Sequence, residues 1–178
     1  MISEINTVED LNKNLNMGPG YGGYLDILKA IKLPKEEWEN YCLWKEDKYT
    51  RNCLSNCDAY ELILMCWGKE QHSPIHTYNF QEGWIKVLEG ELSIDLYRID
   101  KDSLSCVLDE TIVIKEKEYT YLNDTMGFHR VRASADGKTV SLHLHSERVR
   151  EWEVFKDCKK EFQMEKPQYD SKTEECSE

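Results

Sequence analysis

The chain has 178 residues, which is the size of one globular domain. Its formal net charge of −11 argues against nucleic acid and anionic membranes as partners, because binding to either requires basic patches. No apolar run approaches the roughly 20 residues of a membrane span, and the first residues lack the charged-then-apolar plan of an export signal. We therefore expect a cytoplasmic protein that binds neither membrane nor nucleic acid.

The first part of the chain, to about residue 45, carries helical patterns. Thr7 is followed by two acidic residues, which is typical of a helix N-cap and first turn. Four glycines and a proline in residues 18–23 should end that helix. Apolar residues recur at helical spacing over 24–31, and Pro34 stands where a further helix would begin. The sequence predicts a helical segment over about residues 1–45.

From Tyr49 onward the pattern changes to short apolar or alternating runs separated by polar turns. This pattern favours an antiparallel barrel or sandwich. Residues 166–178 are polar and acidic, so we expect a flexible tail there and a single domain over residues 1–165. The predicted strands cover residues 62–67, 84–88, 92–97, 104–108, 111–114, 118–122, 129–133 and 139–145.

The seven cysteines are odd in number and irregularly spaced. Cys53 and Cys57 are four residues apart, but no second pair of cysteines or histidines completes a zinc site. In a chain without a visible export signal, reduced thiols are the expected state.

Four of the five histidines lie in segments with strand patterns. Residues two apart on a strand point to the same face, so His143 and His145 share a face, as do His76 and Tyr78. A small barrel could bring these side chains together at one interior site. Taken singly, each histidine also fits a surface position or a hydrogen-bonded core position, which is the better interpretation for His72.

Several segments together resemble the cysteine dioxygenases, in order from about Tyr49 to His145. The most specific is Tyr121-Leu122-Asn123-Asp124-Thr125-Met126-Gly127-Phe128-His129-Arg130-Val131. The other matching segments are Tyr49-Thr50-Arg51-Asn52, Met65-Cys66-Trp67-Gly68, Ser73-Pro74-Ile75-His76, Leu88-Glu89-Gly90-Glu91-Leu92 and Val140-Ser141-Leu142-His143-Leu144.

The resemblance implies a mainly β fold, a cupin double-stranded barrel (jelly roll) behind a helical N-terminal segment. In that family three histidines hold a mononuclear ferrous iron, and cysteine and dioxygen react there to give a sulfinate. A facial three-ligand site suits this chemistry because it leaves positions open for substrate and oxygen. The resemblance maps two of the ligands onto His76 and His129. It maps the arginine that binds the substrate carboxylate onto Arg51, whose planar fork matches a carboxylate.

The chain departs from the family at two positions of this site. The second metal histidine falls on Tyr78, and the family's active-site tyrosine falls on His145. Ser141 and His143, which support that tyrosine in the family, are kept. The cysteine that some members cross-link to the tyrosine falls on Gly83, as it does in members that lack the cross-link, and without the tyrosine the cross-link is impossible here.

Three hypotheses follow for the metal. Tyr78 could ligate as a phenolate, which would favour Fe(III) or Cu(II) over Fe(II). His145 could instead restore a three-histidine site, with Tyr78 as a polar neighbour. The site could also be degenerate, leaving a metal-free binding protein.

From these hypotheses we predict a metal-dependent oxygenase that oxidises a small amino acid or aminothiol with dioxygen. Its expected cofactor is iron, as Fe2+ or Fe3+, with copper as the alternative. An altered oxidase or oxygenase acting on a different amino acid remains open, as does the oligomeric state.

Overall fold

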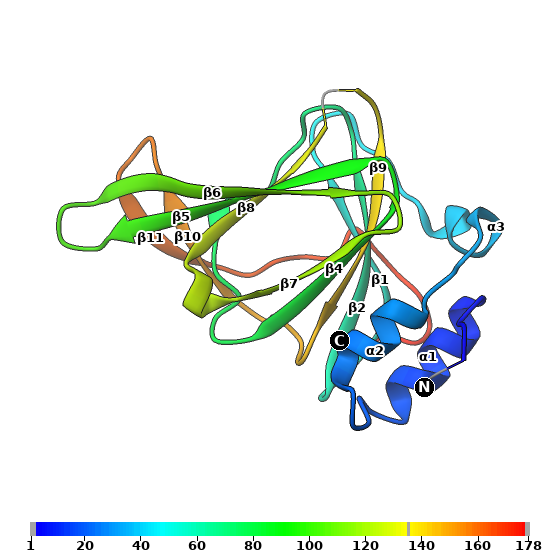
Figure 1. Cartoon of the computed structure of the whole chain (residues 1–178). Coiled ribbons are helices and arrows are strands. Elements are labelled where there is room, and N and C mark those ends of the chain that lie inside the picture. The colour runs from blue at the N-terminus through cyan, green and yellow to red at the C-terminus, as the bar shows by residue number, and fades with distance from the viewer. Residues whose placement is uncertain (1–2, 135, 177–178) are drawn as a thin grey trace.

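The structure is a computed structural model that describes residues 3–134 and 136–176. Its strands form two six-stranded sheets, which face each other as the two layers of a barrel (Figure 1). The first sheet contains, in spatial order, β12 (Ser171–Lys172), β1 (Thr50–Cys57), β2 (Tyr60–Trp67), β9 (Thr139–His145), β4 (Glu82–Glu89) and β7 (Tyr119–Asn123). The second contains β11 (Glu161–Glu165), β10 (Trp152–Lys156), β3 (Ile75–His76), β8 (Phe128–Ala133), β5 (Glu91–Asp100) and β6 (Ser105–Lys115).

The helical N-terminal segment is confirmed. Thr7 caps the first helix by accepting a hydrogen bond from the Asp10 backbone N–H at 3.0 Å. No helix among the described residues has the length and apolar character needed to span a membrane. The helices are α1 (Val8–Asn16), α2 (Gly23–Ala30) and α3 (Lys35–Trp38), with 3-10 turns η1 (Glu39–Tyr41) and η2 (Asp124–Met126).

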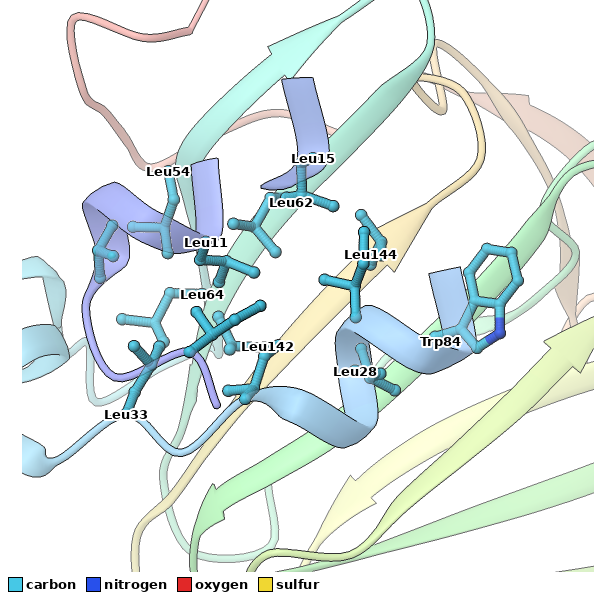
Figure 2. Close-up of a cluster of buried hydrophobic side chains, with 14 of the residues drawn as sticks. Leu11, Leu15, Leu28, Leu33, Leu54, Leu62, Leu64, Trp84, Leu142 and Leu144 are labelled. Atoms are coloured by element: carbon cyan, nitrogen blue, oxygen red, sulfur yellow. The ribbon is translucent and has the colours of Figure 1, made fainter. Parts of the chain in front are cut away.

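Both faces of strand β2 are buried, and for different reasons. Leu62 and Leu64 belong to the hydrophobic cluster that includes α1 and α2, and Figure 2 shows them beside Leu11. Ile63 and Met65 belong to the second cluster, which fills the barrel. The helices therefore cover the outer face of the first sheet, which explains why this strand reads as a continuous apolar run.

Strand β9 also has one face toward the helices and one toward the barrel interior, but its interior face is polar. Leu142 and Leu144 point toward the helices, as Figure 2 shows. Because side chains alternate along a strand, Ser141, His143 and His145 point into the barrel. The polar residues of this strand are thus all on the interior face, where they are buried.

The strands predicted at 104–108 and 111–114 are one strand, β6. Its pairing with β5 shifts between Leu96 and Tyr97, so that Leu96 lies opposite Glu110 and Tyr97 opposite Leu108. Asp109 is the extra residue of this bulge, and the bulge interrupts the sequence pattern where the prediction placed a break.

Residues 166–176 are not a loose tail, and the last two residues of the predicted tail, 177–178, lie outside the described residues. Ser171 and Lys172 form β12, which pairs in parallel with β1. The backbone N–H of Asp170 donates to the Arg51 carbonyl at 2.7 Å, and its carboxylate accepts from the Arg51 N–H at 3.0 Å. Lys45 and Lys48 each lie 2.7 Å from the same carboxylate. Composition alone predicted disorder because these tertiary partners are more than 100 residues away in the chain.

The expectation that all the cysteines are reduced is also wrong for one pair. Cys53 on β1 is bonded to Cys176 near the C-terminus, 123 residues apart in sequence. The other five cysteines are free, and Cys57 is exposed. Nothing in the local spacing of the cysteines signals this bond, since the parallel pairing of β12 with β1 is what brings the two together.

We predict that Cys176→Ser lowers the free energy of unfolding by about 2–4 kcal/mol, because a crosslink across a long loop restricts the unfolded chain. Denaturant unfolding under non-reducing conditions measures the change. Cys158→Ser, at an exposed free cysteine, is the matched control and should leave stability unchanged. Equal midpoints for the two variants would contradict the prediction.

Candidate metal centre

His76 and His129 are direct cross-strand partners on β3 and β8. Their ring centroids lie 4.3 Å apart, and both side chains are buried. Nδ1 of His76 lies 2.9 Å from the Pro74 carbonyl oxygen. Because a carbonyl only accepts, Nδ1 carries the hydrogen and Nε2 keeps its lone pair free. The backbone thus fixes the tautomer that a metal ligand needs.

Nε2 of His129 is buried and has no hydrogen-bond partner among the described residues. A buried polar atom without a partner is costly, so such an atom indicates a missing ligand. Burial lowers the pKa of His76 to about 3 and holds the pKa of His129 well below its ordinary value. Both imidazoles are therefore neutral near pH 7, which is the state that binds metal ions.

Tyr78 lies against this histidine pair. Its ring centroid is 4.5 Å from that of His129 and 5.8 Å from that of His76. Asp124 fixes the backbone here by accepting hydrogen bonds from the Tyr78 N–H at 2.6 Å and the Phe80 N–H at 2.5 Å. Burial raises the pKa of the Tyr78 phenol, so in the absence of a cation it keeps its proton. The Asp124 segment thus positions a neutral phenol beside two neutral imidazoles.

Gly83 on β4 makes room for Tyr78. A Cβ at this position would lie 2.6 Å from Cε2 of Tyr78 and 3.2 Å from Cδ2 of His145. Both rings occupy the space that any larger residue would need.

We therefore predict that Gly83→Ala costs about 1–3 kcal/mol of stability, because the new methyl group overpacks the barrel interior. Gly137→Ala is the control, since a Cβ there meets nothing within 4 Å, and it should be nearly neutral. Denaturant unfolding of both variants measures the difference. A Gly83→Ala protein as stable as the control would show that Tyr78 does not lie against Gly83.

His145 points into the barrel but is held by a different partner. Its Nδ1 lies 2.8 Å from Oε2 of Glu61, which is its direct neighbour across the β2–β9 ladder. Its ring centroid is 4.9 Å from that of Tyr78. Over residues 3–134 and 136–176, no three His, Cys, Asp or Glu side chains converge as a metal-ligand set. The side chains packed directly against one another here are the two imidazoles of His76 and His129 and the ring of Tyr78.

Glu61 is the centre of a buried charge network that the sequence analysis missed. Besides His145, its carboxylate lies 3.8 Å from Nη2 of Arg51 and accepts a hydrogen bond from the hydroxyl of Tyr169. Burial alone would raise the pKa of Glu61, but the hydrogen bond with His145 and the positive charge of Arg51 outweigh it and hold the pKa below its ordinary value. The carboxylate is therefore ionised. A lone glutamate at the start of an otherwise apolar strand is the signal that could have identified it.

Arg51 is buried beside this carboxylate. Its guanidinium carbon lies 5.4 Å from the ring centre of Trp152, a second residue that the sequence analysis missed. Its Nε–H has no acceptor among the described residues. Arg51 thus retains a hydrogen-bond donor inside the barrel.

Ser141 and His143 form a second hydrogen-bonded chain on the β9 face. The Trp67 indole N–H donates to Oγ of Ser141 at 2.9 Å, and the same oxygen lies 2.9 Å from Nε2 of His143. Burial keeps the pKa of His143 well below its ordinary value, so this ring is neutral. These contacts hold the His143 ring in a fixed orientation.

These groups surround a small cavity of about 20 Å³ between the sheets. That volume holds roughly one water molecule. An amino acid or thiol would therefore enter only if some of the lining side chains moved. The lining residues are Tyr49, Arg51, Met65, Trp67, Ser73, His76, Tyr78, Val131, His143, His145 and Trp152.

The structure thus brings most of the sequence-predicted residues together. Arg51, His76, Tyr78, His143 and His145 line one cavity, with His129 and Ser141 in contact with its walls. Two residues near the motifs do not join them. His72 forms an isolated bridge with Arg132, and Glu82 accepts a hydrogen bond from the Tyr121 hydroxyl.

Two neutral imidazoles and a phenol are a donor set suited to a transition metal, and the unpartnered His129 Nε2 agrees with that use. The residues present therefore fit a metal held by His76, His129 and Tyr78.

Comparison with known proteins agrees with the family resemblance seen in the sequence. The sequence profile of the family described as cysteine dioxygenase type I matches residues 24–157. Human cysteine dioxygenase type 1 is 33% identical over 123 residues, which cover 67% of this chain and 62% of the human protein. The Danio rerio cysteine dioxygenase type 1 is 27% identical over 149 residues, which cover 79% of this chain and 74% of the fish protein. The chain thus matches less than two thirds of the length of its human relative.

A structural likeness supports the fold. A conserved Klebsiella pneumoniae protein with a double-stranded beta-helix domain superposes with a TM-score of 0.51 and 10% sequence identity. The match covers 61% of this chain and 80% of that protein. At this identity the likeness concerns the fold alone, and the predicted mainly β cupin barrel is confirmed.

Proposed function

We propose that this chain, which belongs to the cysteine dioxygenase type I family, is a metal-dependent oxygenase that oxidises a small amino acid or aminothiol with dioxygen. The observation that carries the proposal is the buried pair His76 and His129. Each has a neutral imidazole with a free Nε2, and His76 lines the cavity that Arg51 also lines.

In this proposal His76, His129 and Tyr78 hold one iron ion. When bound, the iron supplies a redox-active centre with coordination positions left for substrate and oxygen. Tyr78 would bind through its phenolic oxygen after losing its proton, because a nearby cation offsets the effect of burial on the phenol. The donor set departs from the three histidines implied by the family resemblance, and it favours Fe(III) over Fe(II). Nothing in the arrangement of the donors favours copper over iron.

Arg51 would bind the carboxylate of an amino-acid substrate. Its unpartnered Nε–H supports this role, because a guanidinium binds a carboxylate through two parallel donors. Glu61 and Trp152 would hold the guanidinium in place, the first by charge and the second by its ring face.

His145 would accept the proton of the substrate thiol or amine. Its Nδ1 is committed to Glu61, which leaves Nε2 as the nitrogen available for proton transfer in the cavity. Ser141 and Trp67 would keep His143 neutral and fixed as a wall of the pocket. The small volume of the cavity would exclude bulk water once the substrate is bound.

The experiment that tests the proposal is metal analysis of the protein purified without added metal, together with oxygen uptake over a set of amino acids and small thiols. Near-stoichiometric iron with oxygen uptake on at least one compound is the expected result. Stoichiometric copper without iron would replace the assigned metal. Protein that stays metal-free and consumes no oxygen after incubation with iron would instead establish the non-catalytic binder.

A further inference from the structure

A second, larger groove lies outside the barrel interior, beside the C-terminal segment. It has a volume of about 320 Å³, in the lower part of the range of small-molecule sites. Its lining residues come from the loop after β9 and from the chain between β11 and the end of β12, which Figure 1 shows as the orange-to-red trace returning to β1. Four of its lining residues are basic, namely Arg148, Arg150, Lys166 and Lys172, and none of the described acidic side chains lines it.

This concentration of positive charge is unusual in a chain with a net charge of −11. Among the described residues, Arg150 is the only one of the four with an ion-pair partner, the exposed Asp58 at 4.0 Å. The nearby Asp170 is already engaged by Lys45 and Lys48. The groove therefore gathers cations whose mutual repulsion no carboxylate of its own wall offsets.

Arg148, which lines the groove, carries an unsatisfied donor. Its Nη1 is buried and has no hydrogen-bond partner among residues 3–134 and 136–176. A buried guanidinium nitrogen without an acceptor is costly, and an oxyanion is the group whose geometry it matches.

Tyr169 forms the partition between the groove and the barrel. Its ring centre lies 5.4 Å from the guanidinium carbon of Arg148 and 5.7 Å from Nζ of Lys172. On the barrel side it lies 6.0 Å from the guanidinium carbon of Arg51, and its hydroxyl donates to Glu61. Burial, with the charge of Glu61, raises the pKa of Tyr169 to about 12, so the phenol that separates the groove from the barrel is uncharged.

We propose that this groove binds a small molecule through an oxyanion that carries more than one negative charge, such as a phosphate ester or a polycarboxylate. Arg148 and Arg150 supply planar forks for the oxygens, while Lys166 and Lys172 supply compact charges at the opposite wall. Several cations converging on one space favour a multiply charged anion over a single carboxylate. The inference does not depend on the metal centre, because none of these four side chains lines the inner cavity.

Calorimetric titration with inorganic phosphate and, separately, with citrate tests the proposal, with ionic strength held constant by chloride. The probe variant is Lys166→Gln/Lys172→Gln, since both side chains are exposed and their loss should not affect folding. The matched control is Lys159→Gln/Lys160→Gln, which removes the same charge at the turn between β10 and β11.

We expect saturable one-site binding of at least one probe by the wild type and the control, with affinity at least tenfold lower in the groove variant. Saturation by phosphate alone would identify a phosphate ester, and saturation by citrate alone a polycarboxylate. Binding of neither probe, or equal affinity in the groove variant and the control, would overturn the proposal. Circular dichroism of each variant confirms that the protein compared is folded.

Discussion

Replacing His129 with alanine should remove nearly all of the bound metal and all oxygenase activity. His129 presents a buried Nε2 with no other partner in the described structure, so no alternative role accounts for that nitrogen. Loss of one of three protein ligands leaves too few donors to hold the ion against water. Metal content after gel filtration, measured by mass spectrometry, gives the result directly.

The matched control is His72→Ala, because His72 does not line the cavity and its ring nitrogen Nδ1 lies 2.9 Å from the neighbouring Ser73 carbonyl oxygen. It should keep the metal content of the wild type. Near-stoichiometric metal in the His129→Ala protein, with metal loss in the control, would show that the metal binds elsewhere.

Glu61→Gln should lower the free energy of unfolding by about 3 kcal/mol, because it leaves the buried Arg51 cation without its counter-charge. The amide keeps the size of the carboxylate, so the effect reports charge and hydrogen bonding and not packing. Glu89→Gln is the control, since its ion pair with Lys35 is largely exposed, and the expected change there is below about 1 kcal/mol. Denaturant unfolding of both variants measures the two changes.

The destabilisation caused by Glu61→Gln should depend on pH. The folded protein holds the pKa of Glu61 below its ordinary value of 4.5, so the stabilisation from this group is complete above about pH 4.5. This stabilisation is lost as the pH falls through the lowered pKa, because the Glu61 carboxylate is then protonated in the folded protein as well as in the unfolded protein. The stability gap between wild type and Glu61→Gln should therefore shrink in acid. A gap that stays constant from pH 7 to about pH 3 would contradict the assignment of Glu61 as the ionised partner.

Much of the candidate site follows from short-range patterns. The period of two in β9 places His143 and His145 on one face, and the structure buries both inside the barrel. The motif segments that carry His76 and His129 become adjacent strands, so that the two histidines are cross-strand partners. These contacts depend on strand periodicity and on a family resemblance, both of which are present in the sequence.

The residues that sequence reasoning missed depend on pairings between distant segments. Glu61 meets His145 because β2 and β9 pair in one register across 84 residues. Tyr169 reaches Glu61 because the C-terminal segment returns to β1, where the Cys53–Cys176 bond also holds it. No local sequence preference predicts that the segment pairs with β1, and its polar composition predicts disorder instead.

The role of Tyr78 is the central claim, and the visible absorption spectrum of the oxidised, iron-loaded protein tests it most directly. A phenolate bound to Fe(III) donates charge into the metal and gives a visible band, whereas neutral imidazoles do not. We predict that the wild type shows this band, that Tyr78→Phe abolishes it, and that Tyr49→Phe, which alters another tyrosine of the same cavity, retains it. A colourless Fe(III) wild type whose Tyr78→Phe variant keeps full metal content would contradict the account.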